Sequence, residues 1–579
     1  MPLDPYQIAS SWLQRYGNFL SSGDIHGAAS CLQPDGYLRD LLVFSWNNRC
    51  VNGHEKIAAY LGTARELTSV RNMSLSSRPG LAPRLGGFHA MLISPVPDIV
   101  SAGFTFSCSI GSGQGYFSLV LTDPGEWKAV AVLMSLAEIS GHEEWINEDG
   151  VYGGHTLAWT DVNTERCAAI EQNPHVLIVG GGQTGLNVAA RFKHMNIPSL
   201  VVESNLRIGD NWRKRYPTLA LHSPKKISEM SYQPFPITWP VFTPRDKIAD
   251  WLESYVQSQD LVVWTDSRPL PNPTYDSATK RWTVIIERAG QHVTLTPAHI
   301  VVAAGALGAP KVPTIYNRDV FSGTIKHSSE YNGGKQFMGQ RVVVVGAGNS
   351  AADICQDLSF NGAASVTMVQ RSGTCVVACN TTRTLVECLY PDDIDVDVAD
   401  FLMMAKPILL MQKAYGMMKE QFLEQENAMH QSLREAGLNL TTDKSIFWLA
   451  QQRYGGLDVG CAELIRSGKV KIKQGVEIAG FAENSVVFTD ESFLEADAVI
   501  FATSSESIRD TMRGLFGDST IDQTDAVWGL DEEGELKGVY RPSGHPGLWF
   551  AAGDFATSRF FSKQLALEIK AIDLGLLKL

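Results

Sequence analysis

Two glycine-rich turns, one near residue 180 and one near residue 346, indicate that this chain binds two dinucleotides. The first turn follows an uninterrupted aliphatic run, Val176–Val179, and has the pattern G-x-G-x-x-G. We expect its first glycine to make the tight turn, its second to let the backbone approach a pyrophosphate, and its third to pack helix against strand. The pyrophosphate would then lie at a helix N-terminus, which favours an anion. The residues predicted to contact this ligand are Gly180, Gly182, Gln183, Thr184 and Gly185.

The strand that follows each turn predicts which dinucleotide is bound. After the first turn, a strand at residues 199–202 ends at Glu203, where a carboxylate would accept a hydrogen bond from an adenosine ribose hydroxyl. After the second turn, the corresponding strand runs into Arg371 and Ser372, which could instead bind a 2′-phosphate. Arg371 as a solvated surface charge is the alternative. The two sites together predict FAD and NADPH, the second held by Gly346, Gly348, Asn349 and Ser350.

Composition excludes several classes of partner. The chain has 579 residues, enough for several domains, and a net charge of −13, which argues against a nucleic-acid-binding surface. Its nine cysteines form no close C-x-x-C pair, so we expect no disulfide framework, no metal site and a cytoplasmic location. The most apolar stretch, residues 401–418, is interrupted by Lys406, Pro407 and Lys413, so no transmembrane segment is predicted.

The elements that must position the two turns predict an α/β fold with two Rossmann-like domains. We expect an α+β unit at residues 1–140, with an opening amphipathic helix and strands near 115–121 and 127–133. The remaining predicted segments are a polar linker at 141–172, the FAD-binding domain at 173–335, the NADPH-binding domain at 336–500 with a helical insertion at about 385–450, and a return to the FAD-binding domain at 501–579.

The N-terminal unit resembles the SnoaL-like, nuclear-transport-factor-like family. Residues 36–42 and 52–57 stand where such domains run into their first strand and third helix. The resemblance implies a cone-shaped α+β domain. It could be a second binding cup, a lid or the surface of a homodimer.

Between the two turns, the segment from Phe321 to Tyr331 has the pattern F-x-G-x-x-x-H-x-x-x-Y. It resembles the fingerprint of flavin-containing monooxygenases, and the likeness extends over residues 175–575. Baeyer–Villiger relatives carry tryptophan at the last position, where this chain has Tyr331 followed by Asn332. The histidine of the pattern, His327, is expected to bond between domains rather than to carry protons.

The same resemblance implies roles for four further residues. Asn211 and Trp212 would line the flavin pocket, and Asp554 would lie against the ribityl or pyrophosphate region of the flavin. His222 matches a position near the flavin N5, where animal and bacterial members have asparagine and the plant indole-3-pyruvate oxygenases have histidine. A packed, hydrogen-bonded histidine is the alternative.

One linking segment departs from the family pattern. An alanine-threonine-glycine link is expected near residue 504, where this chain has Ser504. A serine fits there only where φ is negative or strain is tolerated.

The chemistry implied by the resemblance is oxygenation of a small organic substrate with NADPH and dioxygen, through a C4a-(hydro)peroxyflavin. The protein would hold the nucleotides and exclude water, and it would need no acid or nucleophile of its own. Two alternatives remain, a flavin reductase or oxidase without oxygen insertion and a degenerate dinucleotide-binding module. No local pattern identifies the substrate.

Overall fold

A computed structural model describes the chain except for residues 1–2, 65–68, 87–97, 123–124, 146 and 443–454. The N-terminal part is a curved sheet with the strand order β2-β1-β7-β6-β5-β3, in which β4 also pairs with β5. The predicted strands near 115–121 and 127–133 are confirmed as β6 and β7. The strands are β1 (Leu32–Leu41), β2 (Asn48–Asn52), β3 (Arg71–Leu75), β4 (Arg84–Leu85), β5 (Ile99–Cys108), β6 (Gly111–Thr122) and β7 (Glu126–Ile139).

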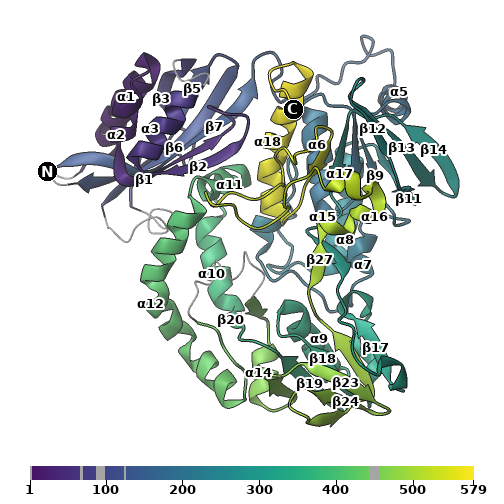
Figure 1. Cartoon of the computed structure of the whole chain (residues 1–579). Helices are drawn as coiled ribbons and strands as arrows, with labels where there is room; N and C mark the ends of the chain where they lie inside the picture. Colours follow the sequence, from purple (N-terminus) through teal and green to yellow (C-terminus); the bar gives the residue numbers. More distant parts are fainter. Residues whose placement is uncertain (1–2, 65–68, 87–97, 123–124, 146, 443–454) are drawn as a thin grey trace.

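Three helices cover one face of this sheet: α1 (Pro5–Ser22), α2 (Ile25–Ser30) and α3 (His54–Thr63) (Figure 1). Helix α1 begins where the Asp4 side chain accepts hydrogen bonds from two backbone N–H groups and ends at Gly23, whose φ is 76°. Its apolar stripe, which includes Trp12 and Tyr16, is buried against the sheet beside Phe117. Residues 36–42 and 52–57 contain most of β1 and the start of α3, as expected.

The other face of the N-terminal sheet is covered by the helical insertion. Leu41 and Leu133 pack with Phe401 and Leu402 of α11, and Tyr37 packs with Leu410 at the start of α12. The insertion contains α10 (Cys379–Leu389), α11 (Val396–Met404) and α12 (Ile408–Glu435), and it is flanked by the parallel pair β20 (Cys375–Ala378) and β21 (Gly455–Asp458).

The connector differs from the prediction. Residues 141–172 were expected to lack a regular element, but they end in helix α5 (Trp159–Gln172), which buries no residue. An exposed helix has no apolar stripe to reveal it in the sequence.

The first dinucleotide unit is a parallel sheet with the order β10-β9-β8-β15-β28. Its aliphatic strands are almost fully buried, as expected for a sheet covered on both faces. The last strand, β28, comes from the C-terminal segment and pairs in parallel with β15. The strands are β8 (Val176–Val179), β9 (Ser199–Val202), β10 (Val263–Trp264), β15 (His299–Val302) and β28 (Leu548–Phe550).

Helices α6 and α18 pack against each other beside this sheet. The helical segments of the unit are α6 (Gln183–His194), α7 (Asp210–Arg213), η2 (Lys225–Ser228), α8 (Arg245–Ser258) and α18 (Phe555–Asp573). A small antiparallel sheet is attached, made of β11 (Ser267–Pro269), β12 (Thr274–Asp276), β13 (Arg281–Arg288) and β14 (Gln291–Leu295).

The second dinucleotide unit is a parallel sheet with the order β17-β26-β18-β19-β22. Strand β17 belongs to the segment that we expected to close the first unit, residues 173–335, but it pairs with β26 of the second. The sequence of a strand of four residues does not show which strand it pairs with. The strands are β17 (Thr324–His327), β18 (Arg341–Val345), β19 (Ser365–Gln370), β22 (Val470–Gln474) and β26 (Ala498–Phe501).

Shorter elements complete this part of the chain. Its helical segments are η3 (Arg318–Val320), η4 (Ser328–Glu330), η5 (Gly334–Phe337), α9 (Asn349–Phe360), α14 (Cys461–Arg466), α15 (Ile508–Thr511), α16 (Arg513–Phe516) and α17 (Asp518–Ile521). Its other strands are β16 (Leu307–Pro310), β23 (Ile478–Ala482), β24 (Ser485–Phe488), β25 (Phe493–Glu495) and β27 (Ser505–Ser507).

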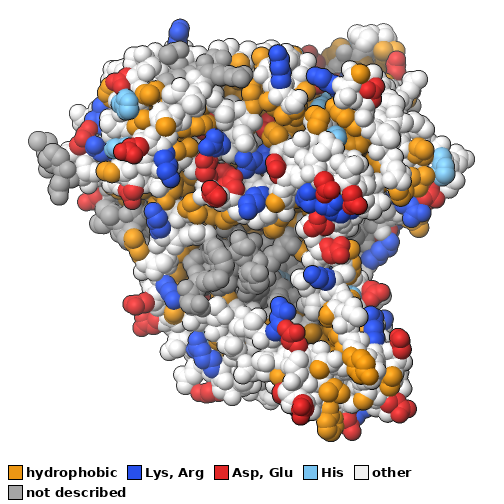
Figure 2. All heavy atoms as spheres, in the orientation of Figure 1, with side chains coloured by type: hydrophobic (Ala, Val, Ile, Leu, Met, Phe, Trp, Pro, Cys, Tyr) orange, Lys and Arg blue, Asp and Glu red, His pale blue; other side chains and the backbone are white. Residues whose placement is uncertain are grey.

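The fold confirms the α/β class with two Rossmann-like units. Among the described residues, no helix has the length and apolar character needed to cross a membrane. On the face drawn in Figure 2, acidic and basic side chains are interspersed.

Candidate active site

The three glycines of the first turn have different surroundings. Gly180 has a φ of 114°, and a Cβ on it would lie 2.6 Å from the Ala303 carbonyl oxygen. A Cβ on Gly185 would lie 1.9 Å from the Gly180 oxygen. Gly182 has extended backbone, and a Cβ there would meet only the Asn211 Nδ2, at 3.3 Å. The first and third glycines therefore serve backbone packing, and the second leaves room for a ligand, as the pattern predicts.

Glu203 lies directly beside this turn. It follows β9, and its Oε2 accepts a hydrogen bond of 2.8 Å from the backbone N–H of Gly181. Its Oε1 accepts from the backbone and side chain of Asn205. The carboxylate that was expected to meet a ribose is therefore held in place at the glycine turn.

The start of α6 has room for an anion. Gly182 is its N-cap, no side chain of the described residues caps it, and the helix begins with Gln183, Thr184 and Gly185. Uncapped N–H groups at a helix start favour a negatively charged ligand. Close by, the indole Nε1 of Trp212 is buried and has no hydrogen-bond partner among the described residues. An uncapped helix start, an open glycine and a buried donor without a partner fit a polar dinucleotide such as FAD.

Asp554 is positioned by α18. Its side chain accepts a hydrogen bond of 2.8 Å from the backbone N–H of Thr557 and so caps this helix. The next residue, Phe555, stacks on Trp212 with the ring centroids 6.5 Å apart. The structure thus brings Asn211, Trp212 and Asp554 to the region of the first glycine turn.

The second turn repeats this geometry. Gly346 has a φ of 129°, and a Cβ on it would lie 2.4 Å from the Ala502 oxygen. Gly348 is the N-cap of α9. Among the described residues, no side chain caps that helix, and a Cβ on Gly348 would meet no atom within 4 Å. Asn349 and Ser350 form the first residues of α9. The second turn is therefore also open to a phosphate group.

Arg371 and Ser372 lie after β19, on the protein surface. The Arg371 side chain is 76% exposed, and its Nη1 lies 3.3 Å from the Glu477 Oε1. An exposed pair of this kind contributes about 0–1 kcal/mol, so the guanidinium is available to another anion. The structure places Arg371 at the end of the strand next to the second turn, as predicted.

His222 contacts the second unit. Its Nε2 lies 3.2 Å from the Oδ2 of Asp353 in α9, and the two side chains are 15% and 10% exposed. The hydroxyl of Tyr216 donates to the same carboxylate oxygen. Burial and the nearby Asp353 charge raise the pKa of Tyr216, so this phenol remains a donor. The histidine that was expected near the flavin is thus paired with a carboxylate of the other unit.

The fingerprint residues make contacts beside the second sheet. His327 accepts a hydrogen bond of 3.1 Å at Nδ1 from the Ser329 N–H, and its Nε2 lies 3.4 Å from the Thr503 oxygen. Because β17 pairs with β26, which ends just before Thr503, these contacts do not bridge the two units, and the expected bonding of His327 between domains stays a prediction. Tyr331 donates a hydrogen bond of 2.6 Å to the Oδ2 of Asp357.

The sequence reasoning missed Asp353 and Asp357. Their spacing of four residues puts both carboxylates on one face of α9, and this spacing was the available signal. Ser504, which was expected to be doubtful, does not have a positive φ, so serine fits there without backbone strain.

Comparisons with known proteins agree with this geometry. A family model described as flavin-binding monooxygenase-like matches residues 172–508. The indole-3-pyruvate monooxygenase YUCCA8 of Oryza sativa subsp. indica is 31% identical over 389 residues, which cover 64% of this chain and 82% of that protein. YUCCA1 of Oryza sativa subsp. japonica is 30% identical over 335 residues, which cover 58% of this chain and 77% of that protein.

Solved structures agree in fold. An ε-caprolactone-bound cyclohexanone monooxygenase in the loose conformation matches with a TM-score of 0.52 at 15% identity, covering 69% of this chain and 88% of that one. An oxidized steroid monooxygenase bound to NADP matches with a TM-score of 0.50 at 18% identity, covering 69% and 86%.

Proposed function

Because the chain belongs to the flavin-binding monooxygenase-like family, we propose that its first glycine turn holds FAD and its second holds NADPH. The chain is an FAD-dependent oxidoreductase that uses NADPH and dioxygen on a small molecule. The observation that carries the site assignment is the pair of open, uncapped helix starts at Gly182 and Gly348, each at the carboxyl end of its parallel sheet.

The bound flavin, once reduced by NADPH, supplies the activation of dioxygen. At the first site, Gly182, Gln183 and Thr184 would present backbone N–H groups to the pyrophosphate, and Glu203 would accept from the ribose. Trp212 would donate its buried indole N–H toward the cofactor and help to exclude water. Asn211 and Asp554 would complete this site.

At the second site, Gly346, Gly348, Asn349 and Ser350 would bind the NADPH pyrophosphate. Arg371 would pair with the 2′-phosphate and Ser372 would support it with its hydroxyl. The 76% exposure of the Arg371 side chain supports this role, because a buried or strongly paired arginine would have to give up a partner first.

For the substrate, we propose a small organic acid with a 2-oxo group. The two plant relatives described above are named for indole-3-pyruvate. Indole-3-pyruvate is therefore the first probe to try.

For the N-terminal domain, we propose a SnoaL-like cone that supports the helical insertion. One face of its sheet packs on α11 and α12, so that face is not available to a second copy of the chain. A homodimer would have to use another surface.

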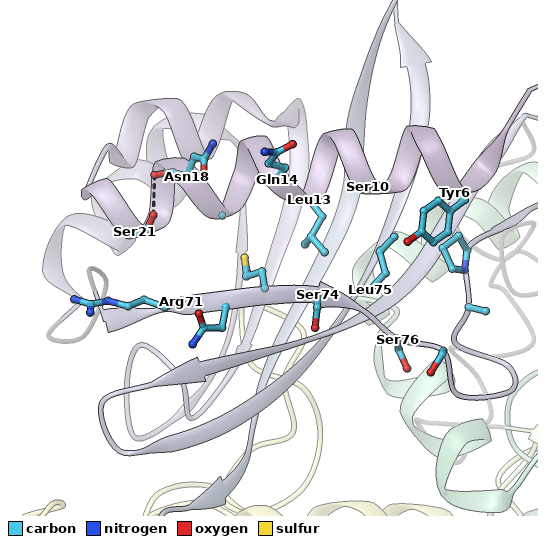
Figure 3. A pocket seen from close by; sticks show the side chains of 16 residues that line it. Tyr6, Ser10, Leu13, Gln14, Asn18, Ser21, Arg71, Ser74, Leu75 and Ser76 are labelled. Carbon is cyan, nitrogen blue, oxygen red and sulfur yellow. Dashed lines mark hydrogen bonds between the residues drawn. The ribbon is translucent and has the colours of Figure 1, made fainter.

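The N-terminal domain also has a groove of about 870 Å³ between α1 and β3 (Figure 3). The residues that line it include Ser10, Gln14 and Asn18 of α1 and Arg71 and Ser74 of β3. Leu13 and Leu75 lie between the two elements in Figure 3. The polar side chains suit ligand binding better than acid–base chemistry.

All nine cysteines lie in the described part of the chain, and none forms a disulfide. Reduced thiols support the cytoplasm as the proposed compartment.

The function can be tested with the purified holoenzyme, NADPH, indole-3-pyruvate and labelled dioxygen. We expect NADPH oxidation that depends on bound flavin and an organic product that carries one atom of the label. Full recovery of the consumed dioxygen as hydrogen peroxide, with unlabelled product, would instead favour an oxidase that inserts no oxygen.

A further inference from the structure

Helix α9 carries two carboxylates that hold the other dinucleotide unit. Asp357 is 4% exposed and accepts hydrogen bonds from Tyr331 (2.6 Å), the backbone N–H of Gly334 (2.6 Å) and Thr218 (3.0 Å). Asp353, one turn earlier, contacts His222 and Tyr216. Both carboxylates therefore bind the segment 216–222, which follows the flavin-site residue Trp212 along the chain.

The two carboxylates have different partners. In the described part of the chain, Asp357 accepts hydrogen bonds only from groups that are uncharged at neutral pH, so we assign it a structural role. Asp353 instead contacts the imidazole ring of His222. Its Oδ2 lies 3.2 Å from the His222 Nε2, close enough for the carboxylate to hold the orientation of the ring. Nδ1 forms no hydrogen bond with the described residues.

The position of Asp353 along α9 connects this contact to the second site. Helix α9 begins at Gly348, the open end assigned to the NADPH pyrophosphate, and Asp353 lies little more than one turn from that end. His222 comes from the first unit and lies in the segment assigned to the flavin pocket. The pair thus joins the binding end of one unit to the ligand-facing segment of the other.

We propose that Asp353 is a positioning residue that holds the orientation of His222 and couples the occupied NADPH site to the environment of the flavin. This inference rests on the proposed function. Without the Asp353 carboxylate, the His222 ring would lose its contact at Nε2 and could rotate while FAD stays bound.

A double-mutant cycle tests the proposal. The variants are Asp353→Asn, His222→Asn and the two together, each as the FAD-loaded full chain. Two quantities are measured: the change in the flavin absorption spectrum when NADP⁺ is added to the oxidised protein, and the hydrogen peroxide released per NADPH oxidised in air. The spectral change requires no turnover, and a purely structural contact would not alter it.

We expect Asp353→Asn and His222→Asn to raise the peroxide ratio by a similar factor, about threefold or more, as for residues in direct contact. The double variant should match either single variant, and all three should show the same altered spectral change. The control is Asp357→Asn, because this carboxylate lies on the same helix, is also largely buried, and has other partners than His222. The factor by which Asp357→Asn changes the peroxide ratio should multiply with the factor for His222→Asn.

Effects of Asp353→Asn and His222→Asn that simply multiply in the double variant would overturn the proposal. An Asp353→Asn protein with the spectral change and peroxide ratio of the unmodified chain would do the same. If Asp353→Asn does not retain FAD, Asp353→Glu keeps the charge but displaces it, and the same non-additivity with His222→Asn is expected. An unmodified protein that binds FAD but oxidises no NADPH would contradict the proposed function, and the spectral cycle would still decide the role of Asp353.

Discussion

At the scale of single residues, each of the three glycines of the first turn is required for its own physical reason. Gly180 and Gly185 are required by the backbone that surrounds them, and Gly182 is not. Because Gly182 has negative φ and an open neighbourhood, a side chain there is compatible with the fold. A larger side chain at this position would instead occupy the space of the cofactor.

Gly182→Val is therefore expected to abolish FAD binding while the apoprotein still folds. Absorbance near roughly 450 nm, a property of the oxidised flavin itself, measures cofactor content, and circular dichroism measures folding. Gly180→Val is the comparison, because its strained φ should also reduce stability. A yellow, fully loaded Gly182→Val protein would show that FAD binds elsewhere.

Arg371→Ala should raise the KM for NADPH about tenfold to a few hundredfold and leave the KM for NADH nearly unchanged. The reason is the loss of a charge-assisted bond worth about 1.5–3 kcal/mol. Steady-state kinetics with both nucleotides measures the effect. Glu477→Gln is the matched control, because it removes the competing carboxylate at 3.3 Å and should not raise the KM for NADPH. Equal losses with both nucleotides would remove Arg371 from the 2′-phosphate site.

At the scale of elements, the sequence predicted those features that depend on residues close to one another along the chain. The order strand, turn, helix around each glycine turn is present in the structure, with Glu203 after β9 and Arg371 after β19, because these elements follow one another directly in the chain. The contact between His222 and Asp353 joins segments far apart in the sequence, and no local period encodes it. For the same reason, the pairing of β17 with the second sheet was not predicted.

Strands β15 and β28 meet at a buried histidine that makes stability depend on pH. His299 accepts a hydrogen bond of 3.2 Å from the Trp549 indole N–H. Burial, with a smaller contribution from His175, lowers the pKa of His299 to about 4, while Asp573 opposes the shift and Arg281 adds to it. The unfolded chain binds this proton near its ordinary pKa of about 6.5. The contribution of neutral His299 to the free energy of unfolding is therefore fully present above a pH of about 6.5, and it is lost as the pH falls toward 4.

We expect the melting temperature of the protein to fall between pH 7 and pH 4.5, and to fall less in His299→Gln. The glutamine can still accept from Trp549 but takes up no proton on unfolding. His175→Gln serves as the control for the neighbouring imidazole. An identical pH dependence in His299→Gln and the unmodified protein would show that another group titrates in this range.

At the scale of the whole molecule, the N-terminal domain is joined to the rest of the chain by buried charge. Arg39 in β1 donates two hydrogen bonds, of 2.6 and 2.7 Å, to the carboxylate of Glu535, and both side chains are 3% exposed. The same guanidinium donates to the Met404 carbonyl oxygen at the end of α11. One side chain thus connects the N-terminal sheet, the helical insertion and the C-terminal segment.

Arg39→Ala should reduce the free energy of unfolding by about 3–5 kcal/mol, because it leaves the Glu535 charge buried without its partner. Replacing both residues by leucine should recover part of this loss. Arg78→Ala is the matched control. It removes an exposed pair with Asp397, which also joins the N-terminal domain to the insertion, and should cost less than about 1 kcal/mol. Denaturant titration measures all four proteins, and equal losses for Arg39→Ala and Arg78→Ala would contradict the structural role of the buried pair.

The central claim is that two dinucleotide sites let NADPH reduce a bound FAD, which then reacts with dioxygen. Anaerobic stopped-flow mixing of the purified protein with NADPH, followed by mixing with dioxygen, tests it most directly. The account predicts that NADPH bleaches the flavin absorbance near roughly 450 nm, that NADH does so poorly, and that dioxygen restores it. A bound flavin that NADPH does not bleach, or a purified protein that takes up no FAD, would contradict the account.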